Sequence, residues 1–360
     1  MIQAVINRYK RMRTDRFLRQ KYHYSYAFVG MGQHSLTNLY PVLHYLGVPL
    51  KYICVTSERK EKLIEDKYRV KATTSLDETL KDEAVKGVFV SVSPSAHFSI
   101  ASQVLQSGKS LFIEKPPCQT LEELDTLIAL QQQHGSPVTM IGLQKQYAPA
   151  VQLLNRRLCK ERLISYDLHY LTGAYPEGNA QLDLYIHPLD LVCFLFGQPE
   201  ILACRQVAKD SFILMLQHPH TVGTLELSTA YSWTTAEESL KVCTSKGIYR
   251  LSQMESLAFT PNSTPILGFP TEKLRTKNRT VEYLFQRNNF MPILANNQIY
   301  TQGYYSEIKA FISQTEGRES KVTTNLKAVR GTYELLQALQ STDNTPLEHP
   351  NNISAQKLST

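Results

Sequence analysis

The sequence lacks the features that mark membrane-spanning, secreted and zinc-centred proteins. Among its 360 residues no apolar run reaches the roughly 18 residues that a transmembrane helix needs. The basic N-terminus contains no apolar segment of the kind that a secretory signal carries. No two cysteines form a C-x-x-C pair, which argues against a zinc site and a disulfide framework; they are Cys54, Cys118, Cys159, Cys193, Cys204 and Cys243. We therefore expect a cytoplasmic chain without a membrane span.

A strongly basic body, the footprint of nucleic-acid binding, is also missing. Residues 1–21 hold seven basic residues and one acid, net +6, which leaves +1 of the chain's total of +7 for everything after them. The near-neutral remainder predicts no nucleic-acid partner. The hydrophobic content of 42% and charged content of 20% are those of a globular protein, and the length is comfortable for two hydrophobic cores.

The basic N-terminal arm, residues 1–22, is predicted to form a helix. Its apolar residues follow helical spacing; they are Ile2, Val5, Ile6, Tyr9 and Met12. A basic amphipathic helix can dock on an acidic partner or a membrane surface. We favour the alternative, a helix lying on its own protein or on a neighbouring subunit, because such stripes are common on ordinary helices.

Strands and helices alternate over residues 23–145. Apolar strands separated by helices are typical of a parallel sheet covered on both faces, so this part is predicted to be an α/β domain. The predicted strands are Tyr24–Val29, Leu50–Val55, Lys71–Ala72, Gly87–Val92, Ser110–Ile113 and Val138–Gly142. The predicted helices are Leu36–Leu46, Glu58–Asp66, Leu76–Leu80, His97–Gln106 and Leu121–His134.

Longer strands with short turns over residues 146–342 predict an α+β domain, with an open, mainly antiparallel sheet and helices on one face. The predicted strands are Leu163–Thr172, Glu200–Val207, Ser211–Gln217, Thr221–Tyr231, Ser239–Thr244 and Gly247–Leu251. The predicted helices are Ala148–Leu158, Asp183–Phe196, Gln302–Gln314 and Leu326–Gln340, and a last helix over 324–340 could instead pack on the first domain. Pro261–Pro292 is expected to be a long loop or lobe and residues 343–360 a loose tail.

The first predicted strand runs directly into a glycine-rich turn. Glycines let the backbone turn tightly and approach a pyrophosphate at the N-terminus of the next helix, so the turn predicts a dinucleotide site. The residues expected there are Gly30, Met31, Gly32, Gln33 and His34. Ser35 replaces the third glycine of the usual G-x-G-x-x-G pattern and is expected to loosen packing at the turn.

The end of the second strand bears on the choice between NAD and NADP. An NAD enzyme usually places an acid there for the ribose 2′-hydroxyl. Here the positions at and just after the strand end are occupied by Thr56, Ser57 and Arg59. A hydroxyl and a guanidinium suit a 2′-phosphate better, so NADP is favoured. Glu58 could still supply the acid, and NAD stays open.

Two further strand ends carry polar residues toward the expected crevice. Ser93, Pro94 and His97 follow the fourth strand, where His97 could bind cofactor or simply pack its helix. Glu114 and Lys115 follow the fifth strand. A lysine beside a nicotinamide is desolvated and feels the positive charge of the cofactor, and both effects lower its pKa toward a range useful for proton transfer. A surface lysine at a strand end is the alternative.

Asp183 and His187 stand four residues apart on a predicted helix and share one face, which Asp190 extends. Such a pair can orient a hydroxyl and shuttle its proton. It could also ligate a metal, but no third ligand stands at useful spacing, so no metal is expected.

Taken in this order, these pieces resemble the Gfo/Idh/MocA family, the glucose–fructose oxidoreductase and inositol dehydrogenase group. The most specific are Glu114-Lys115-Pro116 and the pair Asp183 and His187. The resemblance implies a Rossmann domain, NAD or NADP, and dimers or tetramers formed through the second sheet. It also implies a small-molecule substrate, a sugar, sugar nucleotide or cyclitol whose hydroxyl-bearing carbon exchanges hydride with nicotinamide.

Carried onto this sequence, the resemblance implies that Lys115 contacts the reacting hydroxyl and that His187 is the general acid/base. Asp183 would hold the substrate or orient His187. Lys145 and Tyr147 stand where the family has an arginine-rich turn, and Tyr185 where it has glycine, so both places are expected to shape the substrate pocket. The alternatives are a non-catalytic NAD(P)-binding sensor and a reductase for a non-sugar substrate. The intact set of catalytic residues favours the enzyme.

Overall fold

The computed structural model describes residues 2–18, 22–263, 267, 269, 280–291 and 293–341, with the side chains of 16–18 left aside. These residues fall into two compact units, one over Met1–Gln152 and Asn288–Arg330 and the other over Leu153–Arg287 and Gly331–Thr360. The boundary that the sequence places after residue 145 stays a prediction. The expected tail, 343–360, and most of the expected loop after 263 lie outside the described residues.

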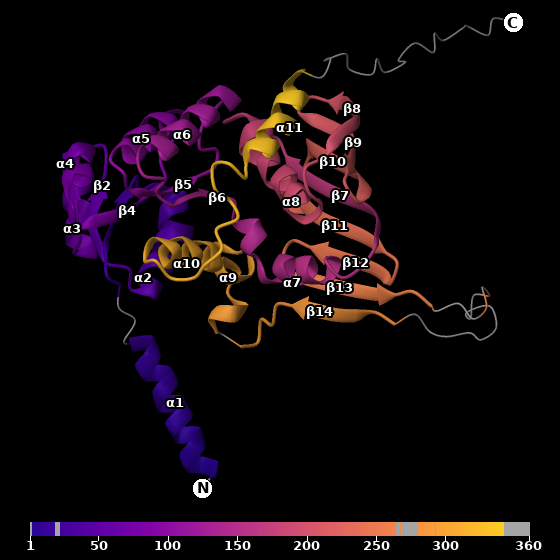
Figure 1. Ribbon diagram of the computed structural model, residues 1–360, viewed down its shortest axis with the longest axis horizontal. Helices are drawn as coiled ribbons and strands as arrows, with labels where there is room; N and C mark the ends of the chain where they lie inside the picture. Colours follow the sequence, from indigo (N-terminus) through magenta and orange to yellow (C-terminus); the bar gives the residue numbers. More distant parts are fainter. Residues whose placement is uncertain are drawn as a thin grey trace, which may run out of the picture. The chain divides into compact units, whose positions relative to one another are not determined.

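The first unit is built on a six-stranded parallel sheet in the order β3-β2-β1-β4-β5-β6. Its strands are β1 (Ser25–Val29), β2 (Leu50–Cys54), β3 (Lys71–Thr73), β4 (Val85–Val90), β5 (Ser110–Glu114) and β6 (Thr139–Gly142). Its helices are α2 (Tyr40–Leu46), α3 (Glu58–Tyr68), α4 (Leu76–Lys81), α5 (Pro94–Gln106), α6 (Leu121–Gln133), α9 (Gln298–Thr301) and α10 (Tyr304–Thr315). Helices α5 and α6 cover one face, and α2 and α10 the other (Figure 1). The predicted α/β domain is confirmed.

The core of this unit lies between the sheet and α10. Phe89 on β4 and Phe112 on β5 are fully buried, with ring centroids 5.4 Å apart. Phe311 of α10 meets both rings edge-on, at 5.2 Å from Phe89 and 5.8 Å from Phe112. A helix predicted at Gln302–Gln314 therefore exists, and its apolar face is buried against the parallel sheet rather than on strands nearer to it in the chain.

The second unit contains an eight-stranded sheet in the order β14-β13-β12-β11-β7-β10-β9-β8. Its strands are β7 (Leu163–Gly173), β8 (Glu200–Ala208), β9 (Ser211–His218), β10 (Thr221–Tyr231), β11 (Glu237–Thr244), β12 (Gly247–Ser252), β13 (Ser256–Pro261) and β14 (Glu282–Gln286). Only β7 and β10 pair in parallel among these described strands. The predicted mainly antiparallel sheet is confirmed.

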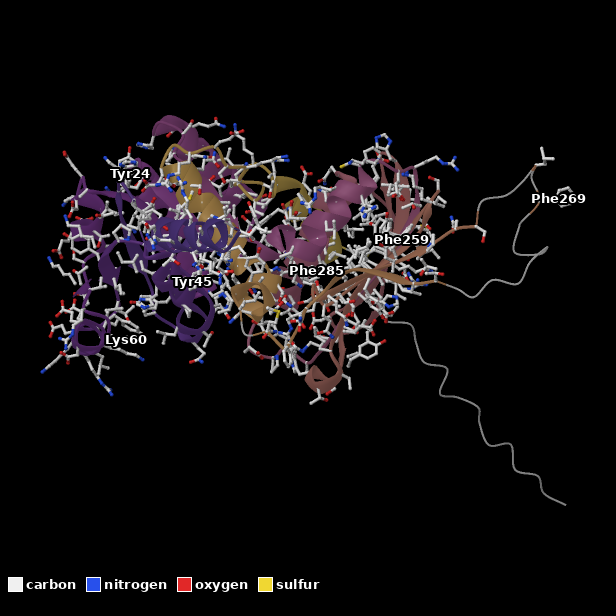
Figure 2. The ribbon with its side chains drawn as sticks, turned by 90° about the horizontal axis from the view of Figure 1, so that it is seen from below. Tyr24, Tyr45, Lys60, Phe259, Phe269 and Phe285 are labelled. Atoms are coloured by element: carbon white, nitrogen blue, oxygen red, sulfur yellow. The ribbon has the colours of Figure 1, made fainter. Side chains whose placement is uncertain are left out.

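The expectation of one long loop over Pro261–Pro292 is wrong at its C-terminal end. Residues 282–286 form β14, which pairs antiparallel with β13, so that Leu257 lies opposite Phe285. The aromatic side chains Phe259 and Phe285 belong to these two strands (labelled in Figure 2). Aromatic residues favour strands even in a short segment between polar loops, and the polar flanks concealed that signal in the sequence.

One face of the second sheet is covered by α8 (Ile186–Phe196), whose Phe196 stacks on Tyr166 of β7 with ring centroids 4.2 Å apart. Two further helices among the described residues are α7 (Pro149–Leu158) and α11 (Arg330–Ser341). Alternate side chains of β9 point to opposite faces: Phe212 and Leu214 are buried, whereas Ile213 and Met215 are exposed by 47% and 42%. The predicted arrangement, helices on one face of an open sheet, is confirmed.

The N-terminal arm forms α1 (Ile2–Leu18), as its spacing predicts. Its apolar residues remain exposed: Ile2 by 78%, Val5 by 65%, Tyr9 by 64% and Met12 by 61%. The described part of the chain therefore does not bury this stripe, and what covers it stays a prediction. No described helix combines the length and apolar character required to cross a bilayer.

The packing of α10 makes a direct prediction for stability. Phe311→Ala removes a fully buried ring between β4 and β5, and we expect it to lower the free energy of unfolding by about 3–5 kcal/mol. Phe290→Ala is the matched control, because the Phe290 ring is 92% exposed. Urea unfolding followed by circular dichroism measures both. Equal effects of the two substitutions would contradict the placement of α10 in the core.

Candidate functional site

A cavity of about 660 Å³ opens in the first unit at the carboxyl ends of β1, β2 and β4. Strand order reverses between β1 and β4, and crevices at such reversal points are where open α/β sheets bind ligands. The lining residues are Val29, Gly30, Met31, Gly32, Gln33, His34, Ser35, Cys54, Val55, Thr56, Lys60, Thr74, Leu76, Ser91, Val92, Ser93, Ala96 and Ile100.

The structure brings together part of the predicted cofactor set. Those that line the cavity are Gly30, Met31, Gly32, Gln33, His34, Thr56 and Ser93. Those that are not among its lining residues are Ser57, Arg59, Pro94, His97, Glu114 and Lys115. Residues that sequence reasoning missed include Lys60, Thr74, Ser91 and Ala96. Contact of any of them with a cofactor stays a prediction.

Gly30 and Gly32, the two glycines of the turn, differ in their surroundings. Gly30 has φ +92°, and a Cβ there would collide with the carbonyl oxygen of Ser91, so β1 can pass this close to β4 only with glycine. A Cβ at Gly32 would have no atom within 4 Å. The space beside Gly32 is therefore left open toward the cavity, where a pyrophosphate could approach the backbone.

Ser35, in the place of the third glycine, does not loosen the turn. The Ser35 side chain is fully buried, and its hydroxyl donates a 2.9 Å hydrogen bond to the hydroxyl of Ser91. It opens a π-helical turn, Ser35–Leu39, which continues into α2. The expected loss of packing is wrong because the serine gains a buried polar partner that a glycine cannot have.

The described lining of the cavity includes a lysine and no acidic residue. Thr56 follows β2, and Lys60 lies one turn further on in α3, where Figure 2 shows its side chain at the edge of the first unit. None of the residues that the structure places around this cavity is Asp or Glu. Such a lining is better suited to a phosphate than to a ribose 2′-hydroxyl that needs a carboxylate acceptor.

His97 packs against the backbone that follows β5. Its ring is buried, and Nδ1 donates to the carbonyl oxygen of Pro116 over 2.6 Å. Burial lowers the pKa of His97, although the bond to Pro116 opposes this, so the ring is neutral at physiological pH. The bond to Pro116 holds the backbone directly after Lys115. Contact of His97 with a cofactor stays a prediction.

Glu114 ends β5 as a buried carboxylate, 6% exposed. It stands opposite Gly142 on β6, where a Cβ would come within 2.8 Å of its Oε2. Its Oε1 lies 3.3 Å from Nε2 of His34, which lines the cavity. Glu114 therefore reaches the cavity wall through the imidazole of His34.

The predicted catalytic pair of the second unit is buried. Asp183 lies in a π-helical turn, Gln181–Tyr185, and His187 in the first turn of α8; each is 8% exposed. Asp183 Oδ2 accepts a 3.0 Å hydrogen bond from the backbone N–H of Asn179. The segment around Asn179 thus fixes the carboxylate, and the roles of both residues in catalysis stay predictions.

Tyr175 is a neighbour of Asp183 that the sequence did not single out. Partial burial raises the pKa of Tyr175, and the adjacent Asp183 carboxylate raises it further. Gly178 allows this approach, because a Cβ there would collide with Asp183 Oδ2 and sit 2.7 Å from the Tyr175 ring. A phenol that stays protonated beside a carboxylate can donate to it and orient it.

The residues predicted to shape the substrate pocket all lie in buried positions. Lys145 and Tyr147 are each 7% exposed in the turn after β6, and the Tyr147 hydroxyl accepts a 2.9 Å hydrogen bond from the N–H of Thr323. Tyr185 is fully buried, meets Phe212 edge-on, and donates its hydroxyl to the carbonyl of Asp210. Their contact with substrate stays a prediction.

Within the described residues, no group of three or more His, Cys, Asp or Glu side chains is arranged to hold a metal ion.

A segment of the first unit is similar to a known protein family. The model of an oxidoreductase family with an NAD-binding Rossmann fold, Gfo/Idh/MocA, matches residues 24–141. The putative oxidoreductase YceM of Salmonella typhimurium is 24% identical over 235 residues, 63% of this chain and 76% of that protein. A solved dehydrogenase from Chromobacterium violaceum superposes with a TM-score of 0.75 at 18% identity, covering 90% of this chain and 96% of that one.

Two relatives with named substrates match over shorter segments. Inositol 2-dehydrogenase of Salmonella typhimurium is 26% identical over 161 residues, 42% of this chain and 48% of that protein. UDP-N-acetylglucosamine 3-dehydrogenase of Acidithiobacillus ferrooxidans is 34% identical over 136 residues, 36% of this chain and 41% of that protein. The alignments thus span about half or less of these two enzymes.

The two glycines separate folding from binding. We expect Gly32→Ala to leave the melting temperature unchanged, because its Cβ meets open space, and to weaken NAD(P)H binding about tenfold or more by filling the pyrophosphate approach. Gly30→Ala should instead lower the melting temperature, because its Cβ strikes the Ser91 carbonyl. Thermal unfolding and fluorescence titration measure these effects. Undiminished dinucleotide binding by the Gly32 variant would contradict the assignment of the turn.

Proposed function

The chain belongs to the Gfo/Idh/MocA oxidoreductase family, with its NAD-binding Rossmann domain at residues 24–141, and on that premise we propose that it is an NAD(P)-dependent dehydrogenase or reductase. It transfers hydride between nicotinamide and a hydroxyl- or keto-bearing carbon of a sugar, a sugar nucleotide or a cyclitol. The inositol and UDP-N-acetylglucosamine dehydrogenases among its relatives support this substrate class.

One observation carries the proposal: the cavity at the reversal of strand order is bounded by a glycine turn whose second glycine faces open space. This is where a pyrophosphate would rest against backbone N–H groups at the start of the following helix. The dinucleotide supplies hydride chemistry when bound, and the protein has to hold the substrate carbon in line with it.

We assign the proton chemistry to Lys115, His187 and Asp183. In the direction of oxidation, His187 takes the proton of the substrate hydroxyl as hydride leaves the same carbon, and Lys115 holds the hydroxyl oxygen. Asp183 is supported as the orienting residue by its own fixed position, since Asn179 donates to its carboxylate and Tyr175 lies beside it. In the direction of reduction, the same groups return the proton to the carbonyl oxygen.

We propose NADP as the preferred cofactor, with Lys60 rather than Arg59 as the contact for the 2′-phosphate. The support is that Lys60 and Thr56 line the cavity, that Arg59 does not, and that no carboxylate is found among the described lining residues. A flexible ammonium group on the first turns of α3 can follow a phosphate at the cavity rim.

We propose a homo-dimer or tetramer formed through the outer face of the second sheet. The exposed Ile213 and Met215 of β9 lie opposite Glu226 and Thr224 of β10, an apolar strip beside a polar one. Two copies of such a face could pair apolar with apolar area.

The assignment of Lys115 makes a kinetic prediction. Lys115→Met should lower kcat by about two to four orders of magnitude, because the ammonium group that holds the reacting oxygen is gone, while the Kd for NADPH changes less than about threefold. A screen of sugars, sugar nucleotides and cyclitols, followed by the absorbance of reduced nicotinamide, supplies the substrate. Wild-type turnover by this variant would contradict the assignment. A wild-type protein that binds NADPH and turns over no substrate would favour the sensor.

Cofactor selectivity makes a second prediction. Lys60→Ala should raise the Kd for NADPH about tenfold or more and the Kd for NADH less than about threefold, because only NADPH loses a charge-assisted hydrogen bond. Arg59→Ala, the same loss of charge one residue away, is the matched control and should change both values little. Fluorescence titration of the two cofactors measures this. A larger selective effect of the Arg59 variant would reverse the assignment.

A further inference from the structure

We propose that protonated His34 offsets the negative charge of Glu114 beside the pyrophosphate site. Dinucleotide binding to this chain therefore weakens as His34 loses its proton. The inference rests on the proposed function, since it concerns the same cavity. It goes beyond that function by predicting a pH dependence and naming the two side chains responsible.

The ion pair joins two strand ends that are not neighbours in the sheet. His34 follows β1 and Glu114 ends β5, with β4 between those strands. Nε2 of His34 lies 3.3 Å from Oε1 of Glu114. The Glu114 side chain is 8% exposed and that of His34 42%, so the imidazole lies between a buried carboxylate and the cavity that it lines.

The surroundings of the ring accommodate both of its protonation states. Nδ1 of His34 lies 3.0 Å from Nδ2 of Asn38, one helical turn further along. The Asn38 amide can donate to Nδ1 of a neutral ring, and after rotation of the amide group its oxygen can accept from a protonated one. In either state Nε2 can carry a proton, 3.3 Å from Oε1 of Glu114. The ring of Tyr304, at 5.9 Å between centroids, limits tilting on another side.

The charged groups that face His34 come from the end of β5. Partial burial lowers the pKa of His34 and the nearby Lys115 ammonium lowers it further, but the interaction with Glu114 outweighs both, so the pKa is raised above its ordinary value of 6.5. Asn38 and Tyr304, which also lie beside the ring, carry no charge near neutral pH. The Glu114 carboxylate thus favours the protonated, positively charged form of His34.

The direction in which the Kd changes with pH follows from the negative charge of the dinucleotide. Its pyrophosphate is negative, and a buried carboxylate at the cavity wall repels it unless that charge is offset. Protonated His34 provides the offset. Because the folded-state pKa is raised, the offset is present at low pH and is lost as pH rises through that pKa. If bound pyrophosphate raises the pKa of His34 by one unit, the Kd is tenfold higher when His34 is fully deprotonated than when it is fully protonated.

The test is calorimetric titration of the full chain with ADP-ribose between pH 6 and pH 8.5. ADP-ribose keeps the pyrophosphate, carries constant charge over this range and cannot react at a nicotinamide. We expect its Kd to rise about three- to tenfold across the range, whereas the Kd for adenosine, which lacks phosphate, stays constant. His34→Gln should bind ADP-ribose with a Kd that does not change with pH. His134→Gln, at an exposed position after α6, is the matched control and should behave as the wild type.

Glu114→Gln provides a second, independent arm. Removing the carboxylate charge with little change of shape should remove the repulsion, so that the rise in Kd shrinks to less than about twofold. Full pH dependence in this variant would overturn the proposal, as would its persistence in His34→Gln. A wild-type Kd that is constant with pH would overturn it too, leaving dinucleotide binding intact. If folded wild-type protein binds no ADP-ribose at any pH, the proposed function fails and this inference with it.

Discussion

The contact between the turn after β1 and the end of β4 is the constraint from which the site is built. Gly30 passes so close to the Ser91 carbonyl that any side chain would collide, and its φ of +92° turns the chain away from the sheet at that point. The hydroxyl of Ser91 is taken by Ser35, which holds the start of the following helix against the same strand. Two neighbouring strand ends are thus locked together while the backbone at Gly32 remains open. The cavity exists because of this arrangement.

Around that cavity, charge is distributed in favour of an anionic ligand. The described lining contains Lys60 and His34, and no carboxylate. The nearest acid of the β5 end, Glu114, is buried and faces the ring of His34. His97, kept neutral by burial, holds the backbone that follows Lys115. His34 therefore acts on the charge at the cavity, whereas His97 holds the backbone in place. Both follow strand ends, so the sequence does not distinguish them.

The sequence was sufficient for the parallel sheet and for most of the second sheet, because buried parallel strands are continuous apolar runs and half-covered strands alternate, and both patterns are local. It did not predict β13 or β14. It was insufficient where a residue's place depends on contacts with distant parts of the chain. Helix α10 belongs with the parallel sheet because its apolar face, with Phe311 against Phe89 and Phe112, packs there. Lys60 rather than Arg59 lines the cavity because of how α3 is rotated, which its charged composition does not reveal. Ser35 departs from the usual glycine pattern, and the sequence does not reveal that its hydroxyl bonds to the buried hydroxyl of Ser91.

The most direct test of the account is a crystal structure of the chain with NADP⁺ and a substrate identified by turnover. The account predicts that the pyrophosphate rests on the turn at Gly32. It also predicts that Lys115 Nζ and a ring nitrogen of His187 both lie within hydrogen-bond reach, about 2.6–3.2 Å, of the substrate oxygen next to nicotinamide C4. A nicotinamide bound away from Lys115, or a substrate oxygen out of reach of His187, would contradict it.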